Sequence, residues 1–305
     1  MVFTNRNRLD GIPGVHDFRQ VRHIQGLSPG MKYYAKDKSG REILLKLFDI
    51  SERRSMENEV ELLKLLASNN IPTNRLLDIG TCNGGRNYYI MLTWIPGADI
   101  ERILRSREDE ISSSLGRQAG MLLRQIHCIP LPDASIHTTT LAESIDDCLF
   151  EFSSNETLIQ RYPSMRYFIA FLEDNKEISS SINTQSILHG DYHAKNLVYR
   201  GTVSVIDWSS GTIGNPIEDF VRNVISAITS PIFASAQICS YFDGLIPDSF
   251  WYLLKVYTAI HELRITKYNL INPAGYPDFV GFQHRLILEQ YDKFNKQIPA
   301  YFREI

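Results

Sequence analysis

The chain has 305 residues, which is room for about two structural units of ordinary size. Its 32 basic and 35 acidic side chains leave a net charge of −3, so a polycation that coats nucleic acid is excluded. Apolar residues make up 43% and charged residues 22%, which excludes a disordered chain. No apolar run approaches the ~18 residues of a membrane span. The N-terminal segment is polar and the cysteines form no CxxC pair, so we expect a cytoplasmic protein with reduced thiols.

Charge is distributed unevenly along the chain. Residues 1–97 carry 14 basic and 10 acidic side chains, whereas residues 98–188 carry 8 basic and 14 acidic ones. The first segment would favour a polyanionic ligand and the second a cationic one. Regional variation of surface charge without functional meaning is an equal alternative.

The first ~95 residues show the pattern of strands with one helix. Residues 30–49 predict a hairpin, because Asp-Lys-Ser-Gly separates two strand-like runs. The second run is apolar except for Lys46, which predicts a strand buried on both faces. A helix is expected over 54–68, with Ser51 or Ser55 as its N-cap, and a strand over 88–94.

Ile95-Pro96-Gly97 ends regular structure, and helical patterns dominate after it. Leu115, Ala119, Leu122 and Ile126 mark one helical face, and further helices are expected at 137–152, 163–178, 217–228 and 249–268. Two short runs at 196–200 and 203–208 predict a small hairpin. The pattern indicates an α+β protein, with a strand-rich lobe at 1–97 and a helical lobe at 98–305.

The segment 189–208 holds the most informative polar residues. It places Asp191, Asn196 and Asp207 near one small hairpin. Carboxylate and amide oxygens are ligands that suit Mg²⁺, which takes few protein groups and completes its shell with phosphate oxygens. His189 and His193 form an HxxxH spacing that could instead suggest zinc, but Gly190 argues against a regular helix there.

HGDxHxxN followed by VIDW resembles the catalytic core of the aminoglycoside phosphotransferase and choline kinase superfamily, the small-molecule relatives of protein kinases. The resemblance implies a two-lobed, protein-kinase-like fold with an antiparallel N-terminal sheet and a helical C-terminal lobe. It implies that Asp191, in a catalytic loop at 189–196, accepts or orients the proton of the attacking hydroxyl. It also implies that Asn196 and Asp207 bind Mg²⁺ and that Lys46 holds nucleotide phosphates.

The partner of Lys46 can be chosen from the helix over 54–68. On a wheel of 100° per residue, Glu59 falls inside the apolar arc, whereas Glu57 and Glu61 face solvent. Burying an unpaired charge is costly, so we expect Glu59 to pair with Lys46. The alternative is that Glu59 lies at the edge of the apolar stripe and reaches solvent.

The resemblance also places the purine site at a hinge near 93–97. The Thr93 carbonyl and the Ile95 N–H would bond the base, since Pro96 has no N–H, and Leu92 would line the pocket behind them. An ordinary strand-to-helix turn is the alternative. Asp219 is expected to brace the catalytic loop. The loop 25–30 departs from the GxGxxG pattern of protein kinases.

These features predict a kinase that moves the γ-phosphate of ATP or GTP to a hydroxyl of a small molecule, with Mg²⁺ and without nucleic acid or membrane partners. An aminoglycoside is the leading acceptor. The alternatives are a choline-like amino alcohol, a sugar or a macrolide, and a nucleotide-binding scaffold without catalysis. Asp146-Asp147 and His261-Glu262 lie in the lobe expected to hold the acceptor, but each is equally explained as a solvated charge.

Overall fold

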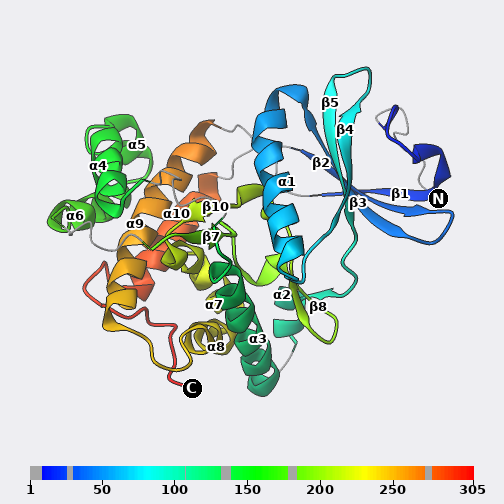
Figure 1. The fold of residues 1–305 in the computed structure, drawn as a ribbon. Helices are drawn as coiled ribbons and strands as arrows, with labels where there is room; N and C mark the ends of the chain where they lie inside the picture. The colour runs from blue at the N-terminus through cyan, green and yellow to red at the C-terminus, as the bar shows by residue number, and fades with distance from the viewer. Residues whose placement is uncertain (1–8, 26–29, 107, 132–138, 178–183, 272–276) are drawn as a thin grey trace. The chain divides into compact units, whose positions relative to one another are not determined.

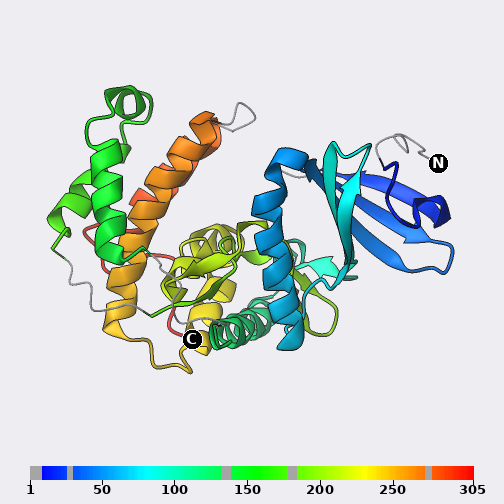
Figure 2. The ribbon, with the colours of Figure 1, turned by 45° about the horizontal axis from the view of Figure 1, so that its top comes forward.

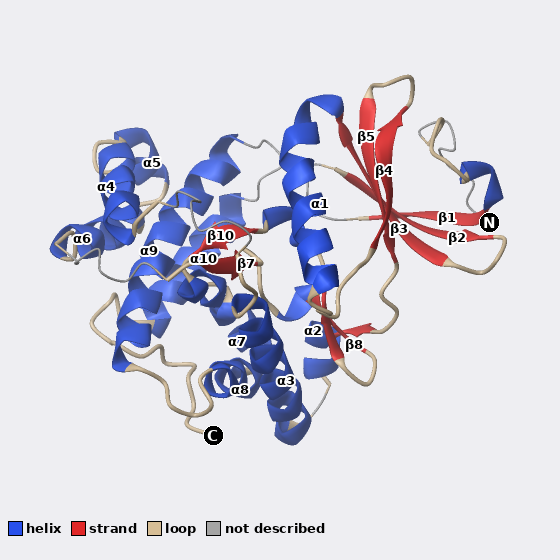
Figure 3. Cartoon of the chain, in the orientation of Figure 1, coloured by secondary structure: helices blue, strands red, loops and turns tan. Residues whose placement is uncertain are grey.

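The computed structural model describes residues 9–25, 30–106, 108–131, 139–177, 184–271 and 277–305. Its contacts divide the chain into two compact units, one formed by Met1–Asp99 with Asn196–Gly211 and the other by Ile100–Lys195 with Thr212–Ile305. Strands dominate the first unit and helices the second (Figure 3), so the α+β class is confirmed. The first division lies close to Gly97. The return of 196–211 to the first unit was not foreseen, and the functional roles of the two lobes stay predictions.

The first unit is built on a five-stranded antiparallel sheet with the order β1-β2-β3-β5-β4 (Figure 1). A short 3₁₀ turn at Val15–Asp17 precedes it. The strands are β1 (Phe18–Ile24), β2 (Met31–Asp37), β3 (Glu42–Asp49), β4 (Leu76–Cys82) and β5 (Asn87–Thr93). The predicted hairpin is β2–β3. Asp37 closes its turn, because its Oδ1 accepts from the Ser39 and Arg41 amides at 2.9 and 3.0 Å.

Strand β3 is buried on both faces, as its apolar sequence predicted. Successive side chains alternate between the two faces of a strand. The odd-numbered residues Ile43, Leu45 and Leu47 join the apolar core on one face of the sheet. Lys46 therefore points to the opposite face.

Helix α1 (Arg53–Ser68) follows β3 and confirms the predicted helix, but the N-cap prediction is wrong. A 3₁₀ turn at Ile50–Glu52 runs directly into α1, and the N-cap of the helix is Glu52, whose side chain makes no capping bond. Ser51 lies in the 3₁₀ turn, where Asp49 accepts a bond from its amide, and Ser55 lies inside α1. The capping side chain is thus that of Asp49, which caps the 3₁₀ turn before α1 and not α1 itself.

A second, three-stranded sheet completes the first unit. It consists of β6 (Ala98–Asp99), β8 (Leu197–Tyr199) and β9 (Val203–Val205), in the order β6-β8-β9. The predicted small hairpin is β8–β9. Gly97 allows the close approach of β6 to β8, because a Cβ at Gly97 would lie 2.7 Å from the carbonyl oxygen of Tyr199.

The second unit is mainly helical, with one short two-stranded sheet made of β7 (Ser186–Leu188) and β10 (Thr212–Gly214). Further 3₁₀ turns occur at Ala194–Asn196, Trp208–Ser210 and Pro216–Phe220; Asn196 and the whole second turn belong to the first unit. The helices are α2 (Ile100–Leu104), α3 (Asp109–His127), α4 (Leu141–Phe152), α5 (Glu156–Arg161), α6 (Met165–Asp174), α7 (Asn223–Thr229), α8 (Pro231–Tyr241), α9 (Asp248–Ile271) and α10 (Pro277–Gln290). The helix predicted over 217–228 is a 3₁₀ turn followed by α7.

Two glycines bring α3 and α8 close together. A Cβ at Gly120 would lie 2.1 Å from the carbonyl oxygen of Gln237, and one at Gly116 would lie 2.4 Å from that of Phe233. Helix α9 packs against α4, α6 and α10, and Figure 2 shows it running alongside α4. None of the described helices combines the length and the apolar character that crossing a membrane requires.

Candidate functional site

The candidate residues of the first unit include a buried ion pair between Lys46 of β3 and Glu59 of α1. Lys46 Nζ lies 2.6 Å from Glu59 Oε1, and the two side chains are 1% and 2% exposed. The pairing expected from the helical wheel is therefore present. Glu57 and Glu61 face solvent and pair instead with Arg53 and Lys64 on the surface of α1.

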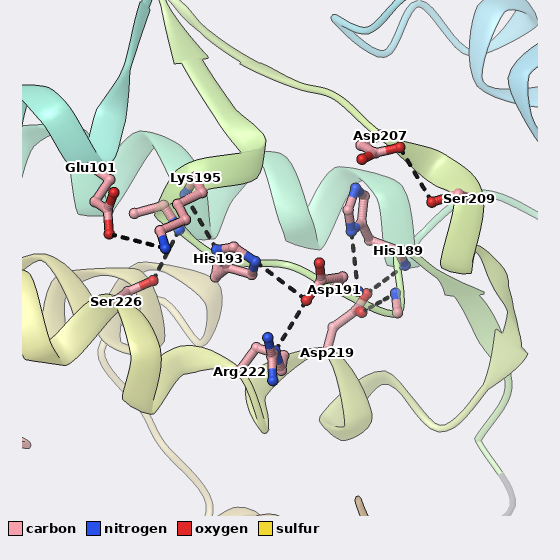
Figure 4. Close-up of polar contacts among 12 residues, drawn as sticks. Glu101, His189, Asp191, His193, Lys195, Asp207, Ser209, Asp219, Arg222 and Ser226 are labelled. Carbon is pink, nitrogen blue, oxygen red and sulfur yellow. Dashed lines mark hydrogen bonds and ion pairs between the residues drawn. The ribbon is translucent and has the colours of Figure 1, made fainter. Parts of the chain in front are cut away.

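Asp207 lies beside this pair, in the same unit. Its Oδ1 is 3.0 Å from Lys46 Nζ and its Oδ2 is 2.6 Å from the Nζ of Lys32, a residue of β2. The Ser209 hydroxyl adds a bond to Oδ1 at 3.2 Å (Figure 4). Asp207 has a φ of 69°, the left-handed conformation that aspartate tolerates better than most residues.

The sequence reasoning did not single out Lys32. A usable signal was present, because the register of the β2–β3 hairpin places Lys32 directly opposite Lys46. Once the Asp-Lys-Ser-Gly turn is assigned, that register follows from counting outward along both strands.

The charges in this cluster hold one another ionised. For Asp207, burial is the largest influence and favours the neutral acid, but the charges of Lys46 and Lys32 outweigh it and lower the pKa below its usual range. For Lys46, burial favours the neutral amine, but the attraction of Glu59 and Asp207 prevails and raises the pKa. Asp207 is thus an anion at neutral pH, as a metal ligand must be.

Asn196, the second expected metal ligand, lies at the same end of the β8–β9 hairpin as Asp207. Asn196 precedes β8, Asp207 follows β9, and the Ile206 amide donates to the Asn196 carbonyl at 2.9 Å. The described residues contain no group of three or more His, Cys, Asp or Glu side chains placed to hold a metal ion. The oxygen donors of Asn196 and Asp207 fit Mg²⁺, which completes its coordination shell with phosphate oxygens. His189 and His193 have no such group of further ligands around them among the described residues, so they do not fit a structural zinc site.

A separate group of candidate residues, in the second unit, is centred on Asp191 in the loop after β7. Its Oδ1 accepts from Arg222 Nε at 3.0 Å and lies 3.3 Å from His193 Nε2 (Figure 4). Burial is the largest influence on the pKa of Asp191 and by itself would raise it. The hydrogen bond from His193 and the electrostatic attraction of His193 and Arg222 outweigh burial and lower the pKa of Asp191 below its usual range.

Asp219, 1% exposed, holds the backbone of this loop. Its Oδ2 accepts from the His189 amide at 2.8 Å, and its Oδ1 accepts from the Gly190 amide at 2.7 Å. Its Oδ2 is also 3.0 Å from His127 Nε2 on α3. The brace that the sequence resemblance implied is therefore present.

The sequence did not lead us to expect His193 and Arg222 as partners of Asp191. His193 was noted for its position but given no role, and Arg222 was not considered. The local signal for Arg222 is its place three residues after Asp219, one helical turn along the segment that follows the 3₁₀ turn at Pro216–Phe220.

The expected hinge residues Leu92 and Thr93 are the last two residues of β5, and Ile95 follows the strand. Leu92 is 1% exposed and pairs with Leu44 of β3 and Leu76 of β4. The Thr93 carbonyl accepts from Asn74 Nδ2 at 2.8 Å, which leaves it one lone pair for a base. Among the described residues, none accepts a hydrogen bond from the Ile95 amide.

Of the other residues noted in the sequence, Asp146 and Asp147 are exposed on α4, whereas Glu262 is buried in α9. Glu262 is therefore not a solvated charge. Most of the loop over 25–30, namely residues 26–29, lies outside the described residues.

Solved structures with similar folds cover most of the chain. The GDP and kanamycin complex of APH(2")-IIia matches with a TM-score of 0.67 at 14% identity, over 91% of this chain and 94% of the other. Amicoumacin kinase hAmiN, solved with AMP-PNP, Ca²⁺ and Ami, gives 0.63 at 13% identity, over 93% and 90%. A choline/ethanolamine kinase family protein from Mesorhizobium loti gives 0.60 at 15% identity, over 94% of each chain. These likenesses confirm the protein-kinase-like fold.

A search among curated protein sequences found no significant match. The sequence model of the phosphotransferase enzyme family, APH, matches residues 23–244, a span that contains Lys46, Glu59, Asp191, Asn196 and Asp207. The chain therefore belongs to the phosphotransferase enzyme family.

Proposed function

We propose that the protein is a small-molecule kinase that transfers the γ-phosphate of ATP or GTP to a hydroxyl group, with an aminoglycoside as the acceptor. The observation that carries the proposal is the cluster of Lys46, Glu59 and Asp207, in which a buried lysine is paired and a carboxylate is held ionised. Phosphoryl transfer needs positioning and neutralisation of charge more than covalent chemistry from the protein.

Each group has a role in the proposed reaction. Lys46, fixed by Glu59, would hold the α- and β-phosphates. Asn196 and Asp207 would hold Mg²⁺, which when bound neutralises charge on the β- and γ-phosphates. The purine would bond to the Thr93 carbonyl and the Ile95 amide beside Leu92.

Asp191 would orient the acceptor hydroxyl and take its proton. Its lowered pKa supports this role, because a carboxylate must be ionised to accept a proton. Arg222 and His193 restrict one of its oxygens, and the Asp219 brace fixes the backbone that carries it.

The acceptor class rests on charge and on similarity of fold. Residues 98–188 carry 8 basic and 14 acidic side chains, a net charge of −6 that attracts polycationic sugars. An amino alcohol is the second candidate, favoured by the fold similarity to the choline/ethanolamine kinase family protein. The four cysteines are free thiols, which supports a cytoplasmic location for either activity.

The test is a phosphorylation screen. Purified protein, Mg²⁺ and ATP or GTP are incubated with aminoglycosides, amino alcohols, sugars and macrolides, and products are detected by the mass of one added phosphoryl group. Phosphorylation of an aminoglycoside supports the proposal, and phosphorylation of another class replaces the acceptor. Nucleotide binding without any product favours the non-catalytic scaffold.

Two variants assign the carboxylates. Asp191→Asn should bind Mg²⁺–nucleotide normally and lose turnover by roughly 10²–10⁴-fold, the usual loss with a general base, or less if Asp191 mainly orients the hydroxyl. Asp207→Ala should lose Mg²⁺–nucleotide binding together with turnover. Asp174→Asn, at the exposed end of α6, is the matched control and should change neither. The assignment is wrong if Asp191→Asn abolishes binding while Asp207→Ala preserves it.

A further inference from the structure

Two lysines stand directly opposite each other on neighbouring strands in the first unit. Lys32 of β2 pairs in register with Lys46 of β3, and their side chains are 13% and 1% exposed. Like charges across an antiparallel pair destabilise a sheet, and more so where water is excluded. Such a pair persists when an anion lies between the two ammonium groups.

Asp207 is that anion, and each of its oxygens serves one lysine. Oδ1 lies 3.0 Å from Lys46 Nζ and Oδ2 lies 2.6 Å from Lys32 Nζ. Lys46 has a second acidic partner in Glu59. Within the described part of the chain, Asp207 is the single acidic partner of Lys32. The four side chains together carry two positive and two negative charges.

This balance changes when Asp207 serves as a metal ligand, the role proposed above. A carboxylate that coordinates a cation no longer neutralises Lys32 fully, whereas Lys46 keeps Glu59. A largely buried ammonium group without a counter-charge is costly, so Lys32 then needs another anion. The proposed co-substrate supplies one, because its phosphates arrive together with the metal.

The sequence of the loop over 25–30 contains no lysine or arginine that could replace this charge. Gly30, its last residue, is explained by packing, because a Cβ there would lie 2.3 Å from the Phe48 ring. The loop sequence also lacks the glycine pattern with which protein kinases bring backbone amides to phosphates. A flexible lysine side chain from the adjoining strand can supply the missing positive charge.

We infer that Lys32 is a second phosphate-binding lysine of the nucleotide site, which exchanges Asp207 for a nucleotide phosphate and so couples metal binding to nucleotide binding. The inference rests on the proposed function, because it takes a nucleotide as the ligand and Asp207 as the metal ligand. A purely structural Lys32 would affect stability without distinguishing phosphorylated from unphosphorylated ligands.

The test is calorimetric titration of adenosine, of ADP and of MgCl₂ alone into the wild type and three variants. Lys32→Gln removes the charge but keeps a donor for Asp207, so the fold is maintained. Lys32→Arg restores the charge. Lys36→Gln is the matched control, because Lys36 lies on the same strand, is 44% exposed, and pairs with Glu42 at 3.9 Å.

Lys32→Gln should weaken ADP binding by about ten- to a hundredfold, the usual effect of losing a hydrogen bond to a charged group, while adenosine binding stays unchanged. Its affinity for Mg²⁺ alone should rise, because Asp207 has lost one competing cation. Lys32→Arg should recover most of the ADP affinity, and Lys36→Gln should match the wild type.

Equal losses for adenosine and ADP in Lys32→Gln, or an ADP affinity equal to that of Lys36→Gln, would overturn the inference and leave the proposed function intact. A wild-type protein that binds neither ADP nor ATP would overturn the proposed function and this inference together. Thermal unfolding of each variant shows whether Lys32→Gln is folded. If Lys32→Gln is not folded, the binding of adenosine and of ADP is compared in the same way for Lys32→Met.

Discussion

Glu262 of α9 predicts a pH dependence of stability that opposes the usual behaviour of carboxylates. The residue is 2% exposed, and its Oε2 has no hydrogen-bond partner in the described part of the chain. Burial raises the pKa of Glu262 from 4.5 to about 7, against a smaller lowering effect of Arg222. His284 Nε2 lies 3.9 Å from Glu262 Oε2. Burial lowers the pKa of His284 to about 4, so no ion pair forms at neutral pH.

The sign follows from proton linkage. The folded state holds the Glu262 proton more tightly than the unfolded chain does, so the stability gained from this proton is present below pH ~4.5 and is lost as the pH rises through ~7. At 1.36 kcal/mol per pKa unit, the difference amounts to about 3 kcal/mol. Glu262→Gln keeps the size of the side chain and removes the titration.

We therefore expect Glu262→Gln to match the wild type near pH 4.5 and to exceed its unfolding free energy by about 3 kcal/mol at pH 8. Urea unfolding at a series of pH values measures both proteins. Burial lowers the pKa of His284 to about 4 and that of His261 to about 3, so these histidines change the stability with pH in the direction opposite to Glu262. Both proteins contain the two histidines, so their contributions cancel when the variant is compared with the wild type.

Glu289→Gln is the control, since Glu289 is exposed on α10. Its difference from the wild type should stay within about ±0.5 kcal/mol at every pH. A difference between Glu262→Gln and the wild type that does not change with pH would refute the reasoning. So would a variant that is less stable than the wild type at pH 8.

Three further predictions concern the first unit and the α3–α8 contact. Glu59→Gln should lower the unfolding free energy by about 3 kcal/mol, because it breaks a buried ion pair, whereas the exposed Glu57→Gln should stay within about 0.5 kcal/mol; equal effects in urea unfolding would contradict the assignment. Leu92→Phe should weaken purine binding by roughly 1–3 kcal/mol through overpacking, and an unchanged nucleotide affinity in calorimetry would show that the hinge is misplaced. Gly120→Ala should destabilise the protein by at least about 1–3 kcal/mol, because its Cβ would meet the Gln237 carbonyl at 2.1 Å; an unchanged midpoint of thermal unfolding would be inconsistent with so close a helix contact.

Much of the site was predictable because local periodicity and a short motif carried it. The 3.6-residue repeat separated Glu59 from Glu57 and Glu61, and the structure pairs Glu59 with Lys46. The Asp-Lys-Ser-Gly turn fixed the β2–β3 hairpin. Asn196 and Asp207 were expected near one hairpin, and the bond between the Ile206 amide and the Asn196 carbonyl holds its two ends together.

Hydrophobic periodicity fails to reveal a helix that is buried on all sides. Helix α8 escaped prediction because every residue from Phe233 to Ile238 is buried, the polar Ser235 and Gln237 included, so no exposed polar face marks its period. Its N-cap, Ser230, accepts a bond from the Phe233 amide, but this signal is weak in isolation.

The sequence by itself determined the α+β class, the Lys46–Glu59 pair and the brace at Asp219, because each follows from a repeat, a turn or a motif within a short stretch of chain. Only the tertiary structure decided which distant charges meet. Lys32 reaches Asp207 across 175 positions, and Arg222 reaches Asp191 across 31. Burial of Glu262 was likewise settled by the packing of α9 against α10. The physical reason is that the cost of a buried charge depends on every neighbour the fold brings near, and these neighbours leave no periodic trace in the sequence.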